Sequence, residues 1–97
     1  MKPIVLKLAR DDLKAIREAL SEFGANPPMK FREGFEKFCS NVTSMPLMYS
    51  QYEYNPEYRR AVMAYGFIVF YKVEEGSNRA EIYRVLHGKR NIVPLLE

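Results

Sequence analysis

Basic side chains are concentrated in the second half of this 97-residue chain. From Tyr58 to Glu97 there are seven lysines and arginines against four glutamates, whereas residues 1–57 hold eight residues of each sign. The whole formal charge of +3 therefore belongs to the second half. A local excess of positive charge raises the concentration of anions around it, so we expect an anionic partner there. The alternative is a solvated surface that only keeps the protein soluble.

Six of these basic side chains are candidates for contacting a target. They are Arg59, Arg60, Lys72, Arg84, Lys89 and Arg90. Just before them, residues 44–56 hold two prolines and three tyrosines without a helical or strand period, which predicts a crossing loop. Its tyrosines, Tyr49, Tyr52 and Tyr54, could stack on unpaired bases. Alternatively, they lie over the rim of the core with their hydroxyls in water.

The chain has one histidine, His87, and one cysteine, Cys39. These two cannot form a structural zinc site, which takes four ligands, and one cysteine cannot form an internal disulfide. We therefore expect no metal and no cofactor. The chain does not open on a basic segment followed by a long apolar run, and no apolar stretch approaches the roughly 18 residues that span a bilayer. These features predict a cytoplasmic protein without a membrane partner.

The first half of the chain predicts a short strand followed by a helix. Residues 2–8 are expected to form the strand, at a sheet edge because Pro3 lacks an amide hydrogen. Asp11 and Asp12 are expected to open the helix, since carboxylates suit its positive N-terminus. Its apolar stripe is Leu13, Ile16, Leu20 and Phe23. Gly24 is placed to end it.

A second helix is expected from Asn26, a candidate N-cap that is followed by Pro27 and Pro28. Its apolar residues recur at helical spacing: Phe31, Phe35, Phe38 and Val42. Two helices joined by about three residues should pack antiparallel as a hairpin. The phenylalanines are then core residues, although a ligand pocket is the alternative.

Three strands are expected over residues 59–64, 67–74 and 79–87. Alternation predicts one face of the middle strand with Val69, Tyr71 and Val73 and another with Ile68, Phe70 and Lys72. On the last strand it predicts that Ile82, Arg84 and Leu86 alternate with Tyr83, Val85 and His87. The element order β-α-α-β-β-β predicts an α+β fold, a mostly antiparallel sheet with a helical hairpin on one face. A partner or ligand is then expected to approach the other apolar face.

Four short motifs in this order resemble the RelE/ParE superfamily of bacterial toxins from type II toxin–antitoxin pairs. They are Ala9-x-x-Asp12-Leu13-x-x-Ile16, an arginine that opens the second strand (Arg59 or Arg60), the segment from Tyr65 to Val73, and the segment from Val85 to Arg90. The resemblance covers nearly the whole chain and implies one toxin domain over residues 1–97.

RelE-type members of that superfamily cleave mRNA in the ribosome, with basic side chains on the open sheet face and a tyrosine or histidine near the C-terminus. Arg59 and Arg90 occupy positions where the RelE-type pattern has basic residues, and His87 is the remaining candidate for proton transfer. However, Ile68 stands where RelE-type members commonly carry arginine. The tail after Arg90 has no tyrosine or histidine, and a lone histidine beside an apolar strand is more often structural.

The sequence Val-Leu-His-Gly-Lys-Arg at 85–90 is instead typical of the ParE-like branch, whose studied members poison DNA gyrase and need no catalytic residues. The resemblance therefore implies a ParE-like gyrase inhibitor that a ParD-like antitoxin neutralises. The antitoxin is expected between the hairpin and the sheet, against Leu13, Ile16, Leu20, Phe31, Phe35, Ile68 and Phe70. The alternatives are a RelE-like ribosome-dependent mRNA endoribonuclease and a non-toxic interaction module of the same fold.

Overall fold

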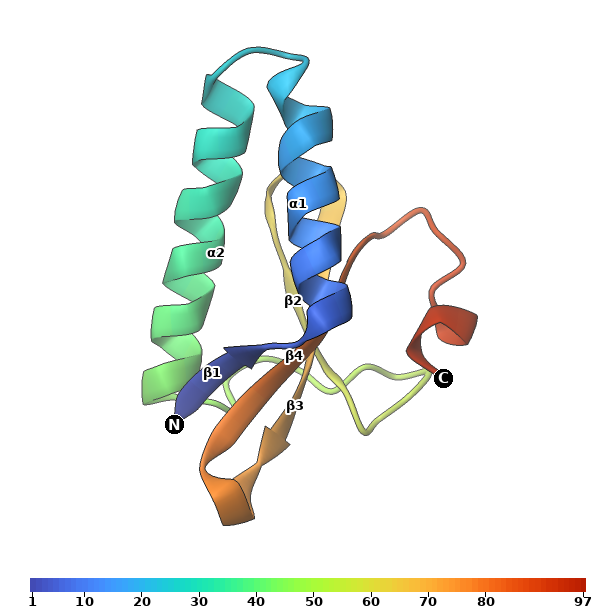
Figure 1. Cartoon of the computed structure of the whole chain (residues 1–97). Coiled ribbons are helices and arrows are strands. Elements are labelled where there is room, and N and C mark those ends of the chain that lie inside the picture. The colour runs from blue at the N-terminus through green and yellow to red at the C-terminus, as the bar shows by residue number, and fades with distance from the viewer.

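A computed structural model describes all 97 residues and shows two antiparallel helices packed on a four-stranded sheet (Figure 1). The elements are β1 (Lys2–Val5), α1 (Lys7–Ser21), α2 (Asn26–Ser44), β2 (Arg59–Val62), β3 (Phe67–Glu74) and β4 (Arg79–His87). The strand order is β1-β4-β3-β2, in which β1 runs parallel to β4 and the other pairs are antiparallel. The predicted α+β fold and its element order are confirmed. No helix has both the length and the apolar character to span a bilayer.

The first strand is an edge strand, as Pro3 predicted, but it is shorter than expected. It ends at Val5, and α1 begins at Lys7, one turn before the two aspartates that were expected to open it. The amide of Arg10 already donates to the carbonyl of Leu6 at 3.0 Å, which closes the first helical turn. Asp11 and Asp12 consequently lie inside the helix, where their carboxylates can contact other elements.

The helical hairpin covers one sheet face and forms the larger core. The first helix ends at Ser21, before the predicted Gly24, which adopts a φ of +108° in the connection between the helices, a conformation that favours glycine. Ala25, not Asn26, is the N-cap of α2, which places both prolines in the first turn. Phe23 lies beyond the end of α1 and is 79% exposed, so it does not join the apolar stripe. The buried residues of this core are Ala9, Ile16, Leu20, Phe31, Phe38, Val42, Ala61, Val69, Tyr71, Ala80, Ile82 and Val85.

The other sheet face is largely covered by the chain itself, contrary to the expectation that it would stay open for a partner. A second cluster of buried residues forms there from the crossing loop, the sheet and the C-terminal tail: Tyr52, Tyr58, Phe70, Leu86, Ile92 and Leu96. The hydroxyl of Tyr58 donates to the carbonyl of Leu96 at 3.0 Å and ties the tail down. The predicted alternation along β3 is confirmed, because Val69 and Tyr71 belong to the helix-side core and Phe70 to this second cluster.

A β-bulge in β4 makes the predicted alternation wrong for Ile82 and Tyr83, whereas Arg84 to His87 alternate as predicted. Phe70 pairs with Arg84, but the next residue, Tyr71, pairs with Ile82, so Tyr83 is an extra residue. Ile82 and Val85 therefore share the helix face, three positions apart. Leu86 and the partly buried Tyr83 belong to the second cluster. A sequence period of two cannot reveal such an insertion, because it depends on pairing between strands.

Two of the three loop tyrosines are core residues. Tyr49 packs against Phe38 and Tyr71, with ring centroids 5.3 and 6.2 Å away, and Tyr52 packs against Phe70 at 5.1 Å. The Tyr71 hydroxyl donates to the carbonyl of Pro46 at 2.8 Å, and burial raises the pKa of Tyr71 to about 12. The crossing loop is thus fixed over both sides of the sheet.

Candidate functional site

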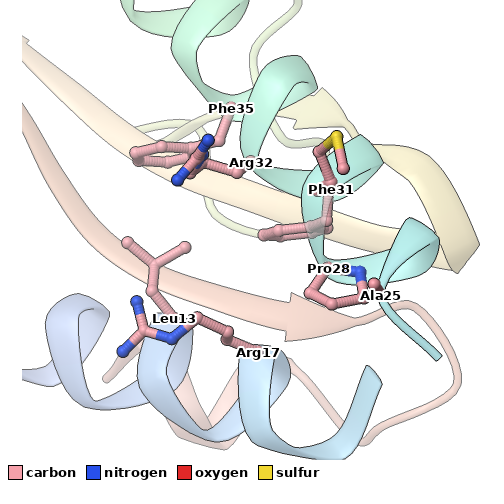
Figure 2. Close-up of a pocket in the computed structure, with 8 residues that line it drawn as sticks. Leu13, Arg17, Ala25, Pro28, Phe31, Arg32 and Phe35 are labelled. Carbon is pink, nitrogen blue, oxygen red and sulfur yellow. The ribbon is translucent and has the colours of Figure 1, made fainter. Parts of the chain in front are cut away.

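A groove runs between the two helices on the hairpin (Figure 2). Its volume is about 500 Å³, which is within the roughly 300–1,000 Å³ typical of binding sites. Its lining residues are Leu13, Arg17, Ala25, Pro28, Met29, Phe31, Arg32 and Phe35. We call it the helical groove. It is apolar at its base and carries two arginines but no acid among its lining side chains, so it favours an apolar segment that bears carboxylates.

Three of the seven residues predicted to bind an antitoxin, Leu13, Phe31 and Phe35, line the helical groove. Three others lie in the protein's own cores. Ile16 is 6% exposed, Leu20 is 8% exposed, and Phe70 has no exposed surface.

The seventh predicted residue, Ile68, is half-buried and lines a different cleft. Sequence reasoning missed Arg17 and Arg32 as groove residues. Their spacing gave a hint, because Arg17 follows Leu13 by one helical turn and Arg32 precedes Phe35 by three positions.

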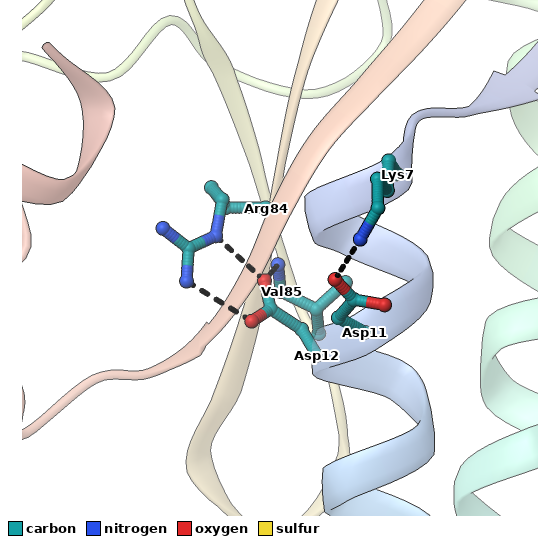
Figure 3. Close-up of polar contacts among 5 residues, drawn as sticks. All are labelled: Lys7, Asp11, Asp12, Arg84 and Val85. Atoms are coloured by element: carbon teal, nitrogen blue, oxygen red, sulfur yellow. Dashed lines mark hydrogen bonds and ion pairs between the residues drawn. The ribbon is translucent and has the colours of Figure 1, made fainter.

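Arg84, one of the residues predicted to contact a target, is bound to Asp12 of α1 (Figure 3). Its guanidinium donates through Nε and one terminal nitrogen to the two carboxylate oxygens of Asp12, at 2.8 and 3.0 Å. The amide of Val85 donates to the same carboxylate at 3.0 Å. The hydrogen bonds to Asp12 raise the pKa of Arg84, although partial burial opposes that shift. This clasp joins α1 to β4 beside the bulge.

Arg59 and Lys72 are also engaged within the chain. Arg59 donates to the carbonyl of Tyr49 at 2.7 Å and so braces the crossing loop. The ammonium of Lys72 lies over the rings of Tyr58 and Tyr83, 4.7 and 4.9 Å from their centroids, and pairs with Glu57 at 3.3 Å. Partial burial lowers the pKa of Lys72, but the neighbouring tyrosines and Glu57 outweigh that effect and raise it.

The other three basic candidates, Arg60, Lys89 and Arg90, make no side-chain hydrogen bond or ion pair within the chain. Lys89 and Arg90 are exposed in the turn after β4, and Arg60 is half-buried on β2. Of the six residues predicted to contact a target, these three have free cationic groups.

His87 lies on the helix side of β4, in the same direction as Val85, as predicted. Its ring stands edge-on to Phe67 with centroids 5.1 Å apart, and its Nδ1 accepts from the amide of Lys89 at 3.1 Å. A Cβ on Gly66 would approach Nε2 to 2.9 Å, so the glycine makes room for the imidazole. Both ring nitrogens are therefore close to backbone atoms of this chain.

Two of the three catalytic candidates, His87 and Arg59, are not brought together. His87 pairs with Phe67 and Arg59 pairs with Tyr71 along β3, four residues apart. At about 3.3 Å per residue, that separates their backbones by about 13 Å along the strand. No group of three or more His, Cys, Asp or Glu side chains is placed to hold a metal ion.

Comparisons with known proteins agree with this fold. Residues 4–92 match the family model described as the ParE toxin of the type II toxin–antitoxin system parDE. A solved structure titled the chromosomal ParDE TA system from P. aeruginosa aligns with a TM-score of 0.62 and 16% identity, over 90% of this chain and 95% of that one. At that identity, the structural likeness supports the fold alone. No curated protein sequence matches. Because the family match extends from the first strand into the C-terminal tail, this chain belongs to the family of ParE toxins of type II toxin–antitoxin systems.

Proposed function

We propose that this ParE-family chain arrests growth by binding DNA gyrase and that a small ParD-like antitoxin neutralises it. The observation that supports a binding mode is that two of the three candidate catalytic residues, His87 and Arg59, are engaged in separate structural contacts. His87 packs on Phe67, and Arg59 braces the crossing loop. A nuclease needs a base, an acid and cations around one phosphate, and such a group of side chains has to converge.

The free cations support a separate target surface. Lys89 and Arg90 are exposed and follow the last strand directly, so their side chains can approach a partner without moving the sheet. Charges at the rim of an interface mainly steer association and select the partner. Gyrase is proposed as that partner from the family membership, and the exposed cluster supplies the surface.

The helical groove is proposed as the antitoxin site. It offers partly exposed apolar side chains from both helices, and an amphipathic segment can bind such a groove through its apolar face. Arg17 and Arg32 would meet carboxylates on that segment. Arg32 has a partner within the chain, Glu36 at 3.7 Å, but both side chains are about 70% exposed, at 73% and 68%, so that pair holds the arginine only weakly.

Reversing both charges of the exposed cluster is expected to abolish toxicity without unfolding the protein. In the double variant Lys89→Glu/Arg90→Glu, a cationic patch becomes anionic and repels the surface that it was meant to meet. Colony counts after induction without antitoxin measure this, alongside a thermal melt of the purified variant. The matched control is Lys14→Glu/Lys37→Glu, two exposed helix lysines outside the helical groove, which should stay toxic. A folded, fully toxic cluster variant would remove this surface from the proposal.

The binding mode itself is tested at His87. The His87→Gln variant should keep most of its toxicity, provided that its melting temperature shows it to be folded. Purified wild-type toxin should inhibit supercoiling of a plasmid by gyrase, and primer extension on mRNA from arrested cells should show no new cuts. Loss of a general acid or base typically lowers a rate about 10²–10⁴-fold. Ribosome-dependent cleavage that disappears in His87→Gln, with supercoiling unaffected, would instead identify a RelE-like ribonuclease.

A further inference from the structure

A second concave site lies on the sheet face opposite the helices, between the crossing loop and the C-terminal tail. Its volume is about 440 Å³. Its lining residues are Gln51, Tyr52, Glu53, Tyr54, Arg60, Ile68, Gly88 and Ile92. We call it the tyrosine cleft. The crossing loop and the C-terminal tail cover the sheet face at Phe70, but they leave the neighbouring Ile68 only half-buried, and the cleft lies there.

The tyrosine cleft presents a fixed aromatic surface to solvent. Tyr54 is 67% exposed, and its ring stands edge-on to Tyr52 with centroids 5.5 Å apart and planes at 71°. Tyr52 is itself held in place, because it packs on Phe70 and its amide donates to the carbonyl of Tyr58 at 2.8 Å. An exposed aromatic ring on a rigid support loses little conformational freedom when a flat ligand stacks on it.

One cation lines the tyrosine cleft, and two more follow one of its lining residues in the chain. Arg60 lines the cleft and has no acceptor within the chain. Gly88 also lines it, and the two residues that follow are Lys89 and Arg90, both exposed. Within the lining, Arg60 is the only cation and Glu53 the only acid, so the positive excess comes from Lys89 and Arg90, which follow Gly88 in the chain.

We infer that the tyrosine cleft binds single-stranded nucleic acid, with an unpaired base on Tyr54 and backbone phosphates on Arg60, Lys89 and Arg90. Aromatic side chains combined with a cationic groove are the usual means of binding single strands, because every base has a π-face and every nucleotide a phosphate. An acidic peptide would use the cations but leave the ring of Tyr54 without a partner. A duplex keeps its bases stacked on one another and would have only its phosphates to offer. This site goes beyond the proposed function, since a toxin could bind gyrase through protein contacts alone.

The test is fluorescence anisotropy of the purified full-length chain with a 5′-labelled ten-nucleotide oligothymidylate. We expect saturable binding that Tyr54→Ala weakens about tenfold, because the variant loses one base–aromatic stack. Arg60→Gln should reduce the slope of log affinity against log salt by about 0.7, the value for one phosphate contact on a single strand. The matched controls are Phe23→Ala, which removes an exposed aromatic ring elsewhere, and Lys14→Gln, which removes an exposed cation. Both should bind like the wild type.

Three results would overturn the inference. The first is the absence of saturable binding at low salt. The second is equal affinity for the oligothymidylate and a duplex of the same length, with Tyr54→Ala unchanged, which would indicate phosphate attraction alone. In the third, polyglutamate displaces the labelled oligonucleotide as effectively as unlabelled oligothymidylate does, which would indicate a surface for acidic proteins.

Tyr54 is exposed, so its alanine variant should fold, and a thermal melt with the wild-type midpoint verifies this. Gyrase inhibition is measured in a separate assay. Failure of the oligonucleotide to bind would therefore overturn this inference without deciding whether the toxin inhibits gyrase.

Discussion

Replacing Asp12 by alanine is expected to lower the free energy of unfolding by about 3 kcal/mol, because removing one partner of a fully buried ion pair costs about 3–5 kcal/mol and the Asp12–Arg84 pair is partly buried. Arg84 is 16% exposed and Asp12 is 14% exposed, so the guanidinium would be left with little water to replace its partner. The amide of Val85 would lose its acceptor at the same time. For a chain of this size, 1 kcal/mol corresponds to about 4–8 °C, so the melting temperature should fall by at least about 12 °C.

The neighbouring residue supplies a matched control. Asp11 pairs with Lys7 at an N–O distance of 3.0 Å, close to the 2.8 and 3.0 Å between Arg84 and Asp12, but the side chains of Asp11 and Lys7 are 59% and 77% exposed (Figure 3). Exposed pairs of this kind contribute about 0–1 kcal/mol, so Asp11→Ala should melt within a few degrees of the wild type. Urea unfolding of both variants measures the difference. Similar losses for Asp11→Ala and Asp12→Ala would show that the clasp between α1 and β4 carries no special stability.

A third variant separates charge from hydrogen bonding in that clasp. Asp12→Asn keeps a carbonyl oxygen that can accept from the amide of Val85, but it removes the negative charge opposite Arg84. We expect a loss between those of Asp11→Ala and Asp12→Ala. If Asp12→Asn is as damaging as Asp12→Ala, the charge dominates. If it matches the wild type, the hydrogen bond to the bulged strand dominates.

The sequence predicted the elements well where a local pattern determines them. The stripe from Leu13 to Leu20 and the stripe from Phe31 to Val42 predicted both helices, and the turn residues that bound the apolar runs predicted the ends of β3 and β4 to the residue. What it did not predict depends on contacts far apart in the chain. The bulge at Tyr83 is set by pairing with β3 and by the clasp to Asp12, 72 positions from Arg84. Alternation of apolar and polar residues along one strand carries no information about the bulge or about the clasp.

The candidate site was only partly predictable for the same reason. Charge counting found the basic half, but it could not separate Arg84, which pairs with Asp12, from Lys89, which faces solvent. Nor could it show that the tail would fold back and bring Ile92 and Leu96 into one buried cluster with Phe70. The availability of a side chain for a partner is decided by the chain's own tertiary contacts. Apolar character on both faces of β3 was therefore compatible with an open surface and with a second internal cluster.

Binding of the antitoxin is expected to stabilise the toxin strongly. A ligand that binds only the folded state adds about 4 kcal/mol at a concentration 1,000 times its dissociation constant. For this chain that corresponds to a rise of at least about 15 °C in melting temperature. The source of the stabilisation would be the helical groove, where the partly exposed Leu13 and Phe35 become covered. A thermal melt of purified toxin, with and without the small protein encoded beside it, measures the rise.

The two groove arginines decide whether that stabilisation arises in the helical groove. In the double variant Arg17→Glu/Arg32→Glu, like charges would face the carboxylates expected on the antitoxin segment, and such juxtapositions cost several kcal/mol. We expect binding to weaken on the order of 100-fold and most of the melting shift to disappear. Both arginines are exposed, so the free variant should melt like the wild type. The control Lys14→Glu/Lys37→Glu makes the same change of net charge on the same two helices, outside the groove, and should bind normally. Equal weakening in both double variants would mean that net charge, rather than the helical groove, governs the encounter, and a full melting shift in the arginine variant would place the antitoxin on another surface.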